Sequence, residues 1–109
     1  MEELQLTKDS KELLAIIYKE YLEKINNGIS KSSAKQIGHA EDVCALAPNW
    51  LPDDVVETMR ELGRAEYIKN TYADNTVYHS VILDKTILYF ENKNIKTVKS
   101  IADWVLKLI

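Results

Sequence analysis

Apolar residues recur at helical spacing along the first part of the chain. The positions are Leu14, Ile17, Tyr18, Tyr21 and Ile25. This period predicts a first helix of about five turns, and Asp9 with Glu12 predicts a capping box at its start. Gly28 lies where a left-handed residue commonly ends a helix, so we expect Ile29 to fold back onto the last turn.

A second, short helix is predicted from the stretch "SKSSAKQIG", residues 30–38. The residues behind this prediction are Ser32 and Ser33 as caps, Ala34 and Ile37 on one face, and Gly38 as the stop. The helix is expected to be short because the apolar face holds few residues.

Pro52 marks the start of a third helix, after a less regular segment at residues 39–51. The segment, "HAEDVCALAPNWL", predicts one or two helical turns before Pro48, and its conformation stays open. Pro52 suits the first helical position, and Asp53 and Asp54 then lie near the positive end of the helix dipole. The predicted buried stripe consists of Val55, Val56, Met59 and Leu62, and the helix is expected to end around residues 63–66.

A β-hairpin is predicted from the stretch "YIKNTYADNTVYHSVIL", residues 67–83. Two runs alternate apolar and polar side chains, and a short Ala-Asp-Asn turn separates them. Because side chains alternate across a strand, Ile68 and Tyr72 are expected on one face of the first strand. Val77, His79 and Val81 are expected on one face of the second strand.

Two further helices are predicted after the hairpin. The stretch "LDKTILYFEN" indicates a short one with Ile87, Leu88 and Phe90. The final segment, residues 95–108, is strongly amphipathic. Its apolar face holds Ile95, Val98, Ile101, Ala102, Val105 and Leu108. This face could pair with its copy in a dimer, but we favour packing onto the first helix, because so small a fold needs a cover for its core.

Length and composition point to one ordinary globular domain spanning residues 1–109. The elements predicted above make this domain mainly α with a small β-hairpin. The chain has 109 residues, of which 46% are hydrophobic and 28% charged. Cys44 is the only cysteine, so it cannot form an internal disulfide, and this favours a reducing compartment. The longest apolar run, "LLAIIY", is too short to span a membrane, and the acidic start is unlike a signal peptide. We therefore expect a cytoplasmic protein with no membrane partner.

Several stretches resemble a winged helix-turn-helix domain, whose order is helix, short helix, helix and two-stranded hairpin. "GISKSSAKQIG" is similar to the second helix of that motif, "VVETMRELGRAEYIKN" to its third helix and first wing strand, and "VILDKTILYFEN" to the segment after the wing. These stretches place the winged-helix resemblance at about residues 9–92, a range that includes the first of two extra C-terminal helices. The second extra helix is the amphipathic segment at about residues 95–108. The tail "IKTVKSIADWVLKLI" looks like the last helix of the small YjcQ-type winged-helix proteins of Gram-positive bacteria and their phages.

Two features depart from this pattern. The connection at residues 39–51 is much longer than the usual turn between the second and third helices, and Thr86 stands where a glycine is typical. The resemblance implies a non-enzymatic, DNA-binding or transcription-related regulator of phage or mobile-element origin.

Charge bears on whether such a domain would bind DNA. The net charge is −3, and the outward face of the third helix carries Asp53, Asp54, Glu57, Thr58 and Glu61. These carboxylates repel phosphates, which normally supply most of the affinity for a duplex. The candidate nucleic-acid contacts are Arg60, Arg64, Lys69, Asn70 and Asn75. The two arginines are also expected to pair with Glu57 and Glu61 on the same helix.

The alternative is a protein-interaction module on the same scaffold. Trp50, Tyr72 and Trp104 are the candidate partner contacts, because aromatic residues are enriched in interface hot spots. Both tryptophans are also expected to be partly buried. A continuous surface holding Arg60, Arg64, Lys69 and Lys93 would favour DNA, whereas dispersal of these cations among carboxylates would favour a protein partner.

The sequence indicates neither an enzyme nor a cofactor. His39, Cys44 and His79 lack the spacing of metal ligands, and Cys44 between Val43 and Ala45 is typical of a small buried residue. The chain has three glycines and no glycine-rich phosphate loop. Ser32 and Ser33 are better explained as helix caps than as nucleophiles.

Overall fold

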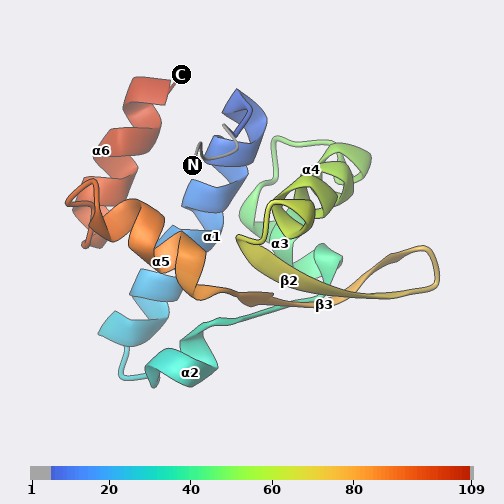
Figure 1. Ribbon diagram of the computed structural model, residues 1–109, viewed down its shortest axis with the longest axis horizontal. Coiled ribbons are helices and arrows are strands. Elements are labelled where there is room, and N and C mark those ends of the chain that lie inside the picture. The colour runs from blue at the N-terminus through green and yellow to red at the C-terminus, as the bar shows by residue number, and fades with distance from the viewer. Residues whose placement is uncertain (1–5, 109) are drawn as a thin grey trace.

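Six helices and a three-stranded antiparallel sheet form the part of the chain that the computed structural model describes, residues 6–108 (Figure 1). In chain order the elements are α1 (Lys8–Asn26), α2 (Lys31–Ala34), β1 (Gln36–Gly38), α3 (Ala40–Leu46), α4 (Pro52–Arg64), β2 (Ile68–Ala73), β3 (Thr76–Ile82), α5 (Asp84–Glu91) and α6 (Val98–Leu108). The predicted mainly helical fold with a small β element is confirmed. The sheet, however, has a third strand.

Helix α1 begins earlier than predicted. Thr7 is its N-cap, and its side-chain oxygen accepts a hydrogen bond from the Ser10 amide at 3.1 Å. The predicted Asp9–Glu12 capping box is therefore wrong, because Asp9 already lies inside the first turn. The other end matches the prediction, since Gly28 has φ of 87° and the Ile29 amide donates to the Lys24 carbonyl at 3.0 Å.

The predicted second helix at residues 30–38 is only partly helical. Ser30, rather than Ser32 or Ser33, caps α2, which ends at Ala34. The chain then becomes extended as β1, which pairs with β3 through Gln36 and Val81. Strand β3 lies far along the sequence, so its free edge could not be recognised from residues 30–38 alone.

Helix α3 lies within the segment at residues 39–51 and ends before Pro48, so the prediction of one or two helical turns there is confirmed. His39 caps it: the His39 Nδ1 atom accepts from the Glu41 amide at 3.0 Å, and Asp42 Oδ2 accepts from the His39 amide at 2.9 Å. Gly38 precedes this cap with φ of 103°, and a Cβ there would lie 2.5 Å from Asp42 Oδ2. Gly38 therefore makes a strand-to-helix corner, instead of ending a helix as predicted.

The hairpin contains a β-bulge that changes which side chains are buried. Asp74 and Asn75 have positive φ and make the tight turn. Thr71 pairs with His79 and Tyr72 with Val77, so β3 has one extra residue, Tyr78, between these pairs.

The buried residues of β3 are consequently Val77, Ser80 and Ile82. The prediction that Val77, His79 and Val81 share one face is wrong, because the bulge shifts the alternation by one residue. His79 instead forms a hydrogen bond of 2.7 Å through Nε2 with Gln36 Oε1 of β1.

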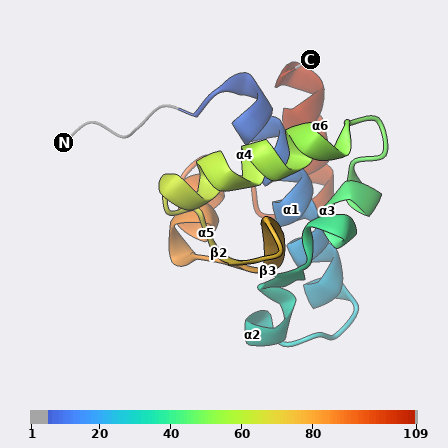
Figure 2. The same ribbon diagram turned by 90° about the vertical axis from the view of Figure 1, so that its right-hand side faces the viewer.

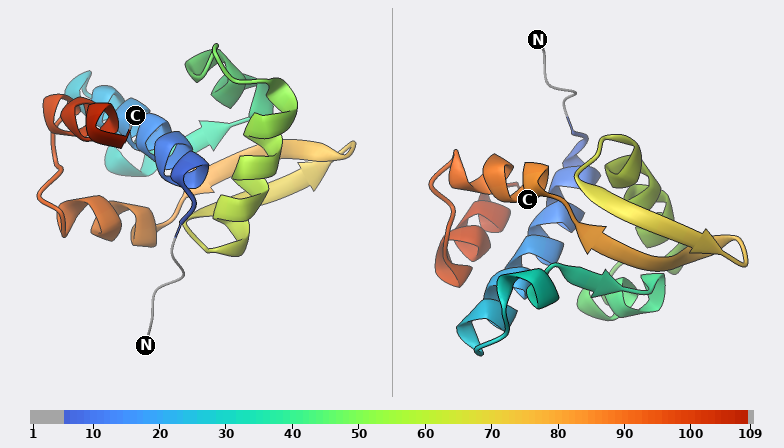
Figure 3. Two further views of the ribbon diagram at one scale, coloured as in Figure 1. Left: turned by 90° about the horizontal axis from the view of Figure 1, so that it is seen from above. Right: turned by 60° about the horizontal axis from the view of Figure 1, so that its bottom comes forward.

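Helix α1 runs through the centre of the molecule, with α5 and α6 on one side and α3, α4 and the sheet on the other (Figures 1 and 3). Tyr18 stacks on Phe90 with ring centroids 4.4 Å apart, and the Phe90 ring is 5.4 Å from that of Trp104. Ile101 of α6 is fully buried in this core. The predicted packing of the last helix onto the first is therefore confirmed.

Thr86, in the first turn of α5, connects this helix to the start of the hairpin through a hydrogen bond. It is fully buried, and its hydroxyl donates to the Tyr67 carbonyl at 2.6 Å. Lys85 donates to the Ala65 carbonyl, at the end of α4, at 2.7 Å. The threonine that departs from the winged-helix pattern thus supplies a buried hydrogen bond that a glycine could not make.

Candidate functional site

Two surfaces of the described chain could receive a partner. The first, here called the α4–hairpin surface, comprises the outward side of α4 and the neighbouring side of the β2–β3 hairpin. Figure 2 shows α4 crossing above the sheet, with α1 behind it. The exposed residues at the start of this helix are Asp53, Asp54 and Glu57. This end of the surface is therefore acidic, as the sequence predicted.

Asn70 fastens the hairpin to α4. Its Nδ2 donates to the Met59 carbonyl at 2.8 Å, and its Oδ1 accepts from the buried Ser80 hydroxyl at 2.7 Å. Gly63 permits this approach, because a Cβ at that position would lie 2.6 Å from Asn70 Nδ2. Asn70 was predicted to contact nucleic acid, but its amide is already occupied within the fold.

Arg60 also contacts the hairpin. Its Nη2 donates to the Asn75 carbonyl at 3.2 Å, and its guanidinium lies 5.1 Å from the centre of the Tyr72 ring. Arg60 forms no ion pair with either expected carboxylate, since Glu61 accepts from the Ser10 hydroxyl of α1 at 2.9 Å and Glu57 pairs with Arg64. Both Arg60 and Asn75 thus help to position the hairpin turn.

Arg64 and Lys69 line one shallow recess where α4 meets β2. The predicted pairing of Arg64 with Glu57 is present at 4.0 Å, between two largely exposed side chains. Glu66 lies in the same recess, whereas Lys93 lies over the Tyr89 ring of α5, with Nζ 4.9 Å from its centre. The four cations therefore form no continuous basic surface over the described residues.

The three predicted aromatic contacts differ in exposure. Trp50 and Trp104 are half-buried and pack against the core, as expected. Tyr72 is 50% exposed on the hairpin. The bulge residue Tyr78 is 61% exposed, and its ring lies 6.2 Å from that of His39. The hairpin therefore presents two tyrosines, and the second depends on a bulge that the alternation pattern does not reveal.

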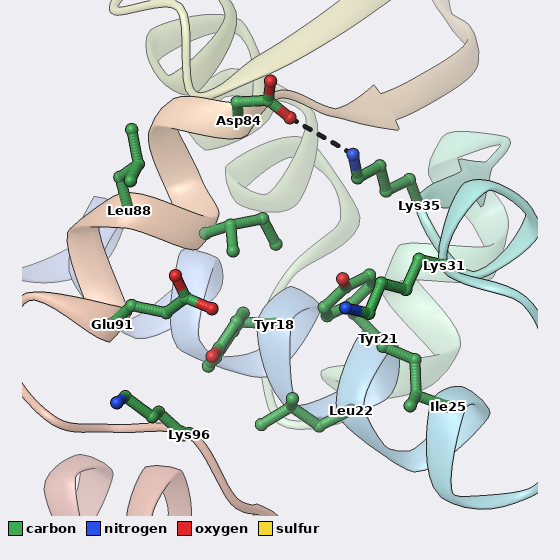
Figure 4. A pocket seen from close by; sticks show the side chains of 11 residues that line it. Tyr18, Tyr21, Leu22, Ile25, Lys31, Lys35, Asp84, Leu88, Glu91 and Lys96 are labelled. Carbon is green, nitrogen blue, oxygen red and sulfur yellow. Dashed lines mark hydrogen bonds and ion pairs between the residues drawn. The ribbon is translucent and has the colours of Figure 1, made fainter.

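The second surface is a groove between α1, α2 and α5, here called the α1–α2–α5 groove. It encloses about 420 Å³, within the range of small-molecule pockets. Apolar side chains form most of its floor and charged ones its rim (Figure 4). The lining residues are Tyr18, Tyr21, Leu22, Ile25, Lys31, Lys35, Asp84, Ile87, Leu88, Glu91 and Lys96.

Two tyrosines of α1 contribute hydroxyl groups to this groove. The Tyr18 hydroxyl donates to the Ile95 carbonyl at 2.9 Å, and burial, together with Glu91, raises the pKa of Tyr18 to about 12. Burial also raises the pKa of Tyr21, although the nearby Lys35 ammonium opposes this shift. Both phenols are therefore protonated at neutral pH, and each carries an O–H group that is able to donate a hydrogen bond.

Sequence reasoning missed this groove. Its residues come from four separate parts of the chain, and Lys35 meets Asp84 at 3.1 Å across 49 positions. A lysine next to an apolar helix face is a common pattern, so no local signal distinguishes these residues from an ordinary solvated rim.

The residue types that commonly bind metal ions are dispersed over residues 6–108. These residues contain no group of three or more His, Cys, Asp or Glu that could hold a metal ion. Cys44 is half-buried, and burial raises the pKa of its thiol. None of the described helices is both long and apolar enough to cross a bilayer.

Comparison with known proteins adds no family. No family model, no curated protein and no solved structure matches this chain.

Proposed function

We propose that this chain is a cytoplasmic winged-helix domain that acts by binding a protein partner through the α4–hairpin surface. The scaffold part of the proposal rests on element order. Helices α1, α3 and α4 followed by the β2–β3 hairpin have the order helix, short helix, helix and wing. With α3 as the second helix, the connection to α4 is residues 47–51, much nearer to a short turn than residues 39–51.

The proposal of a protein partner rests on one observation: most of the predicted nucleic-acid contacts already bind other groups of the fold. Asn70 is bound within the fold, Arg60 and Asn75 hold the hairpin turn, and Arg64 faces Glu57. Asp53, Asp54 and Glu57 remain exposed on the helix that would enter a major groove. Such a surface would repel phosphates and attract a basic protein patch.

Exposed apolar groups lie on the same helix start and on the hairpin. Tyr72, Tyr78 and the 69%-exposed Leu51 lie on the hairpin and at the start of α4. Aromatic side chains carry much of the energy in protein interfaces, where charged neighbours mainly set orientation and association rate. The combination supports a protein partner with a basic rim.

DNA binding is the second candidate, and a specific observation favours it. Arg64 and Lys69 line one recess beside Gly63, next to the hairpin that would serve as a wing. Binding of this kind would rely on phosphate contacts alone and would weaken steeply with salt.

A titration of labelled random duplex DNA with the purified protein tests the two candidates, first at low salt and then at moderate salt. We expect no binding at either salt concentration. Salt-sensitive binding that disappears in Lys69→Glu would contradict the protein proposal and establish the DNA candidate.

The protein partner is tested with a photo-crosslinking amino acid at Glu57, and at Lys107 of α6 as the control. We expect a crosslinked protein from position 57 alone, and its loss in the Asp53→Lys/Asp54→Lys variant. Equal crosslinking from both positions, or no effect of charge reversal, would argue against the α4–hairpin surface.

A further inference from the structure

The α1–α2–α5 groove holds a tyrosine hydroxyl, that of Tyr21, with which no described residue forms a hydrogen bond. Tyr21 is only 5% exposed, yet its hydroxyl makes no hydrogen bond to any residue in the described range. Among the described residues, every side-chain nitrogen or oxygen that is fully buried has a hydrogen-bond partner. The Tyr21 hydroxyl has none, so it is not fully buried and reaches solvent within the groove. A donor at the end of a buried ring is a group that a ligand can use.

Cations stand around this hydroxyl. Lys35 acts on it electrostatically and shares its ammonium with Asp84 at 3.1 Å. Lys31 of α2 lines the same part of the groove, and Figure 4 shows its side chain beside Tyr21. Lys31 forms no ion pair with a described carboxylate. An anion at this position would meet one hydroxyl donor and two ammonium groups.

The charge balance limits the ligand to a single negative charge. Asp84 neutralises Lys35, which leaves Lys31 and Lys96 facing Glu91. The groove therefore carries one net positive charge. A dianion would leave one charge unmatched in a partly apolar site, which is costly.

The remainder of the groove is apolar. Leu22, Ile25 and Ile87 line the groove together with Tyr21 and are partly buried, and Leu88 lines it too, 55% exposed. A hydrocarbon chain or ring bound beside Leu88 would remove this apolar surface from water, which favours binding.

We infer that the α1–α2–α5 groove binds a small amphipathic monoanion, with a carboxylate at Tyr21, Lys31 and Lys35 and an apolar body along Ile25, Ile87 and Leu88. The volume suits a small molecule, and the recessed hydroxyl suits a head group at the end of a short chain. No residue of α4 or the hairpin lines this groove, so the inference is independent of the proposed function.

The test uses octanoate as the probe, titrated into the ¹⁵N-labelled protein and followed by amide chemical shifts. We expect saturable shifts in α1, α2 and α5, and at least tenfold weaker binding of octan-1-ol, which has the same chain without the charge. Tyr21→Phe keeps the ring and loses only the hydroxyl, and should weaken octanoate binding about tenfold.

Two further variants test the chain contact and provide a control. Leu88→Asp should also weaken binding, because it places a charge against the octanoate chain at an exposed position that the fold tolerates. Lys99→Gln on α6, outside the groove, is the matched control and should leave the affinity unchanged. Octan-1-ol binding as tightly as octanoate, unchanged affinity in Tyr21→Phe, or an absence of saturable shifts would each overturn the inference.

Discussion

The two sides of α1 are built in different ways. On the α4 side, polar side chains form hydrogen bonds within the fold: Asn70 of β2 bonds to Met59 and Ser80, and Glu61 of α4 bonds to Ser10. On the α5 side, aromatic rings make the core, and a groove beside them keeps an unpaired hydroxyl at Tyr21. The first side carries the surface that we propose to bind a protein, and the second carries the groove that we propose to bind a small molecule.

This difference shows that predicted binding residues have to be judged by what already occupies them. Polar type alone selected Asn70 as a candidate contact, yet both ends of its amide are used within the fold. Tyr21 was assigned to an apolar helix face, yet its hydroxyl is available. Availability of a polar group is a property of its neighbours, so it is not encoded in the residue type.

The largest expected effect is on the α5 side. Phe90→Ala should lower the free energy of unfolding by about 3 to 5 kcal/mol, because it removes a fully buried ring that contacts Tyr18 and Trp104. Urea unfolding measures this, and the exposed neighbour Leu88→Ala, with an effect below about 0.5 kcal/mol, is the control. A small loss in Phe90→Ala would mean that α5 and α6 contribute little to the core.

Alkaline pH should weaken the same side. The pKa of Tyr18 is raised from 10.0 to about 12 in the folded protein, so the folded state holds the proton more tightly than the unfolded chain. The corresponding stability, roughly 2 to 3 kcal/mol, is fully present below pH 10 and is lost as pH rises toward 12.

Tyr18→Phe removes this titrating group and should show a flatter loss of stability between pH 10 and 12 than the original protein. Urea unfolding at a series of pH values makes the comparison, with Tyr78→Phe at an exposed position as the control. Parallel pH curves for Tyr18→Phe and the original protein would contradict the expectation.

The α4 side should lose stability when a hydrogen bond of the fold is removed. Asn70→Ala should cost about 2 kcal/mol, because it removes the hydrogen bonds of the Asn70 amide with the Met59 carbonyl and with the buried Ser80 hydroxyl. Chemical unfolding measures the loss, and Lys69→Ala, next in the strand and exposed, should change stability little. Equal effects of the two substitutions would show that the Asn70 contacts do not fasten the hairpin.

The smallest effect is expected at the surface pair of Arg64 and Glu57. Both side chains are about two thirds exposed at a separation of 4.0 Å, so Arg64→Ala should change stability by less than about 0.5 kcal/mol. A loss above about 1 kcal/mol in thermal unfolding would mean that Arg64 belongs to the internal contacts of the α4–hairpin surface.

Helix periods and turn residues were the dependable parts of the sequence. The apolar period of α1, Pro52 at the start of α4 and the hairpin turn at Asp74 all appear as predicted. These features depend on neighbouring residues within a few positions, which the sequence lists in order. The end of α1 at Gly28 is of the same kind, because its backbone conformation is a local property.

The remaining features depended on segments distant in sequence. Strand β1 forms because β3 offers an edge to residues 36–38, and the face of β3 is set by a bulge at Tyr78. The groove exists because α2 and α5 meet beside α1. The sequence by itself determined α1, α4 and the hairpin turn, since their causes are local. The tertiary structure alone decided the third strand, the buried face of the hairpin and the available polar groups, since long-range pairing and packing set each of them.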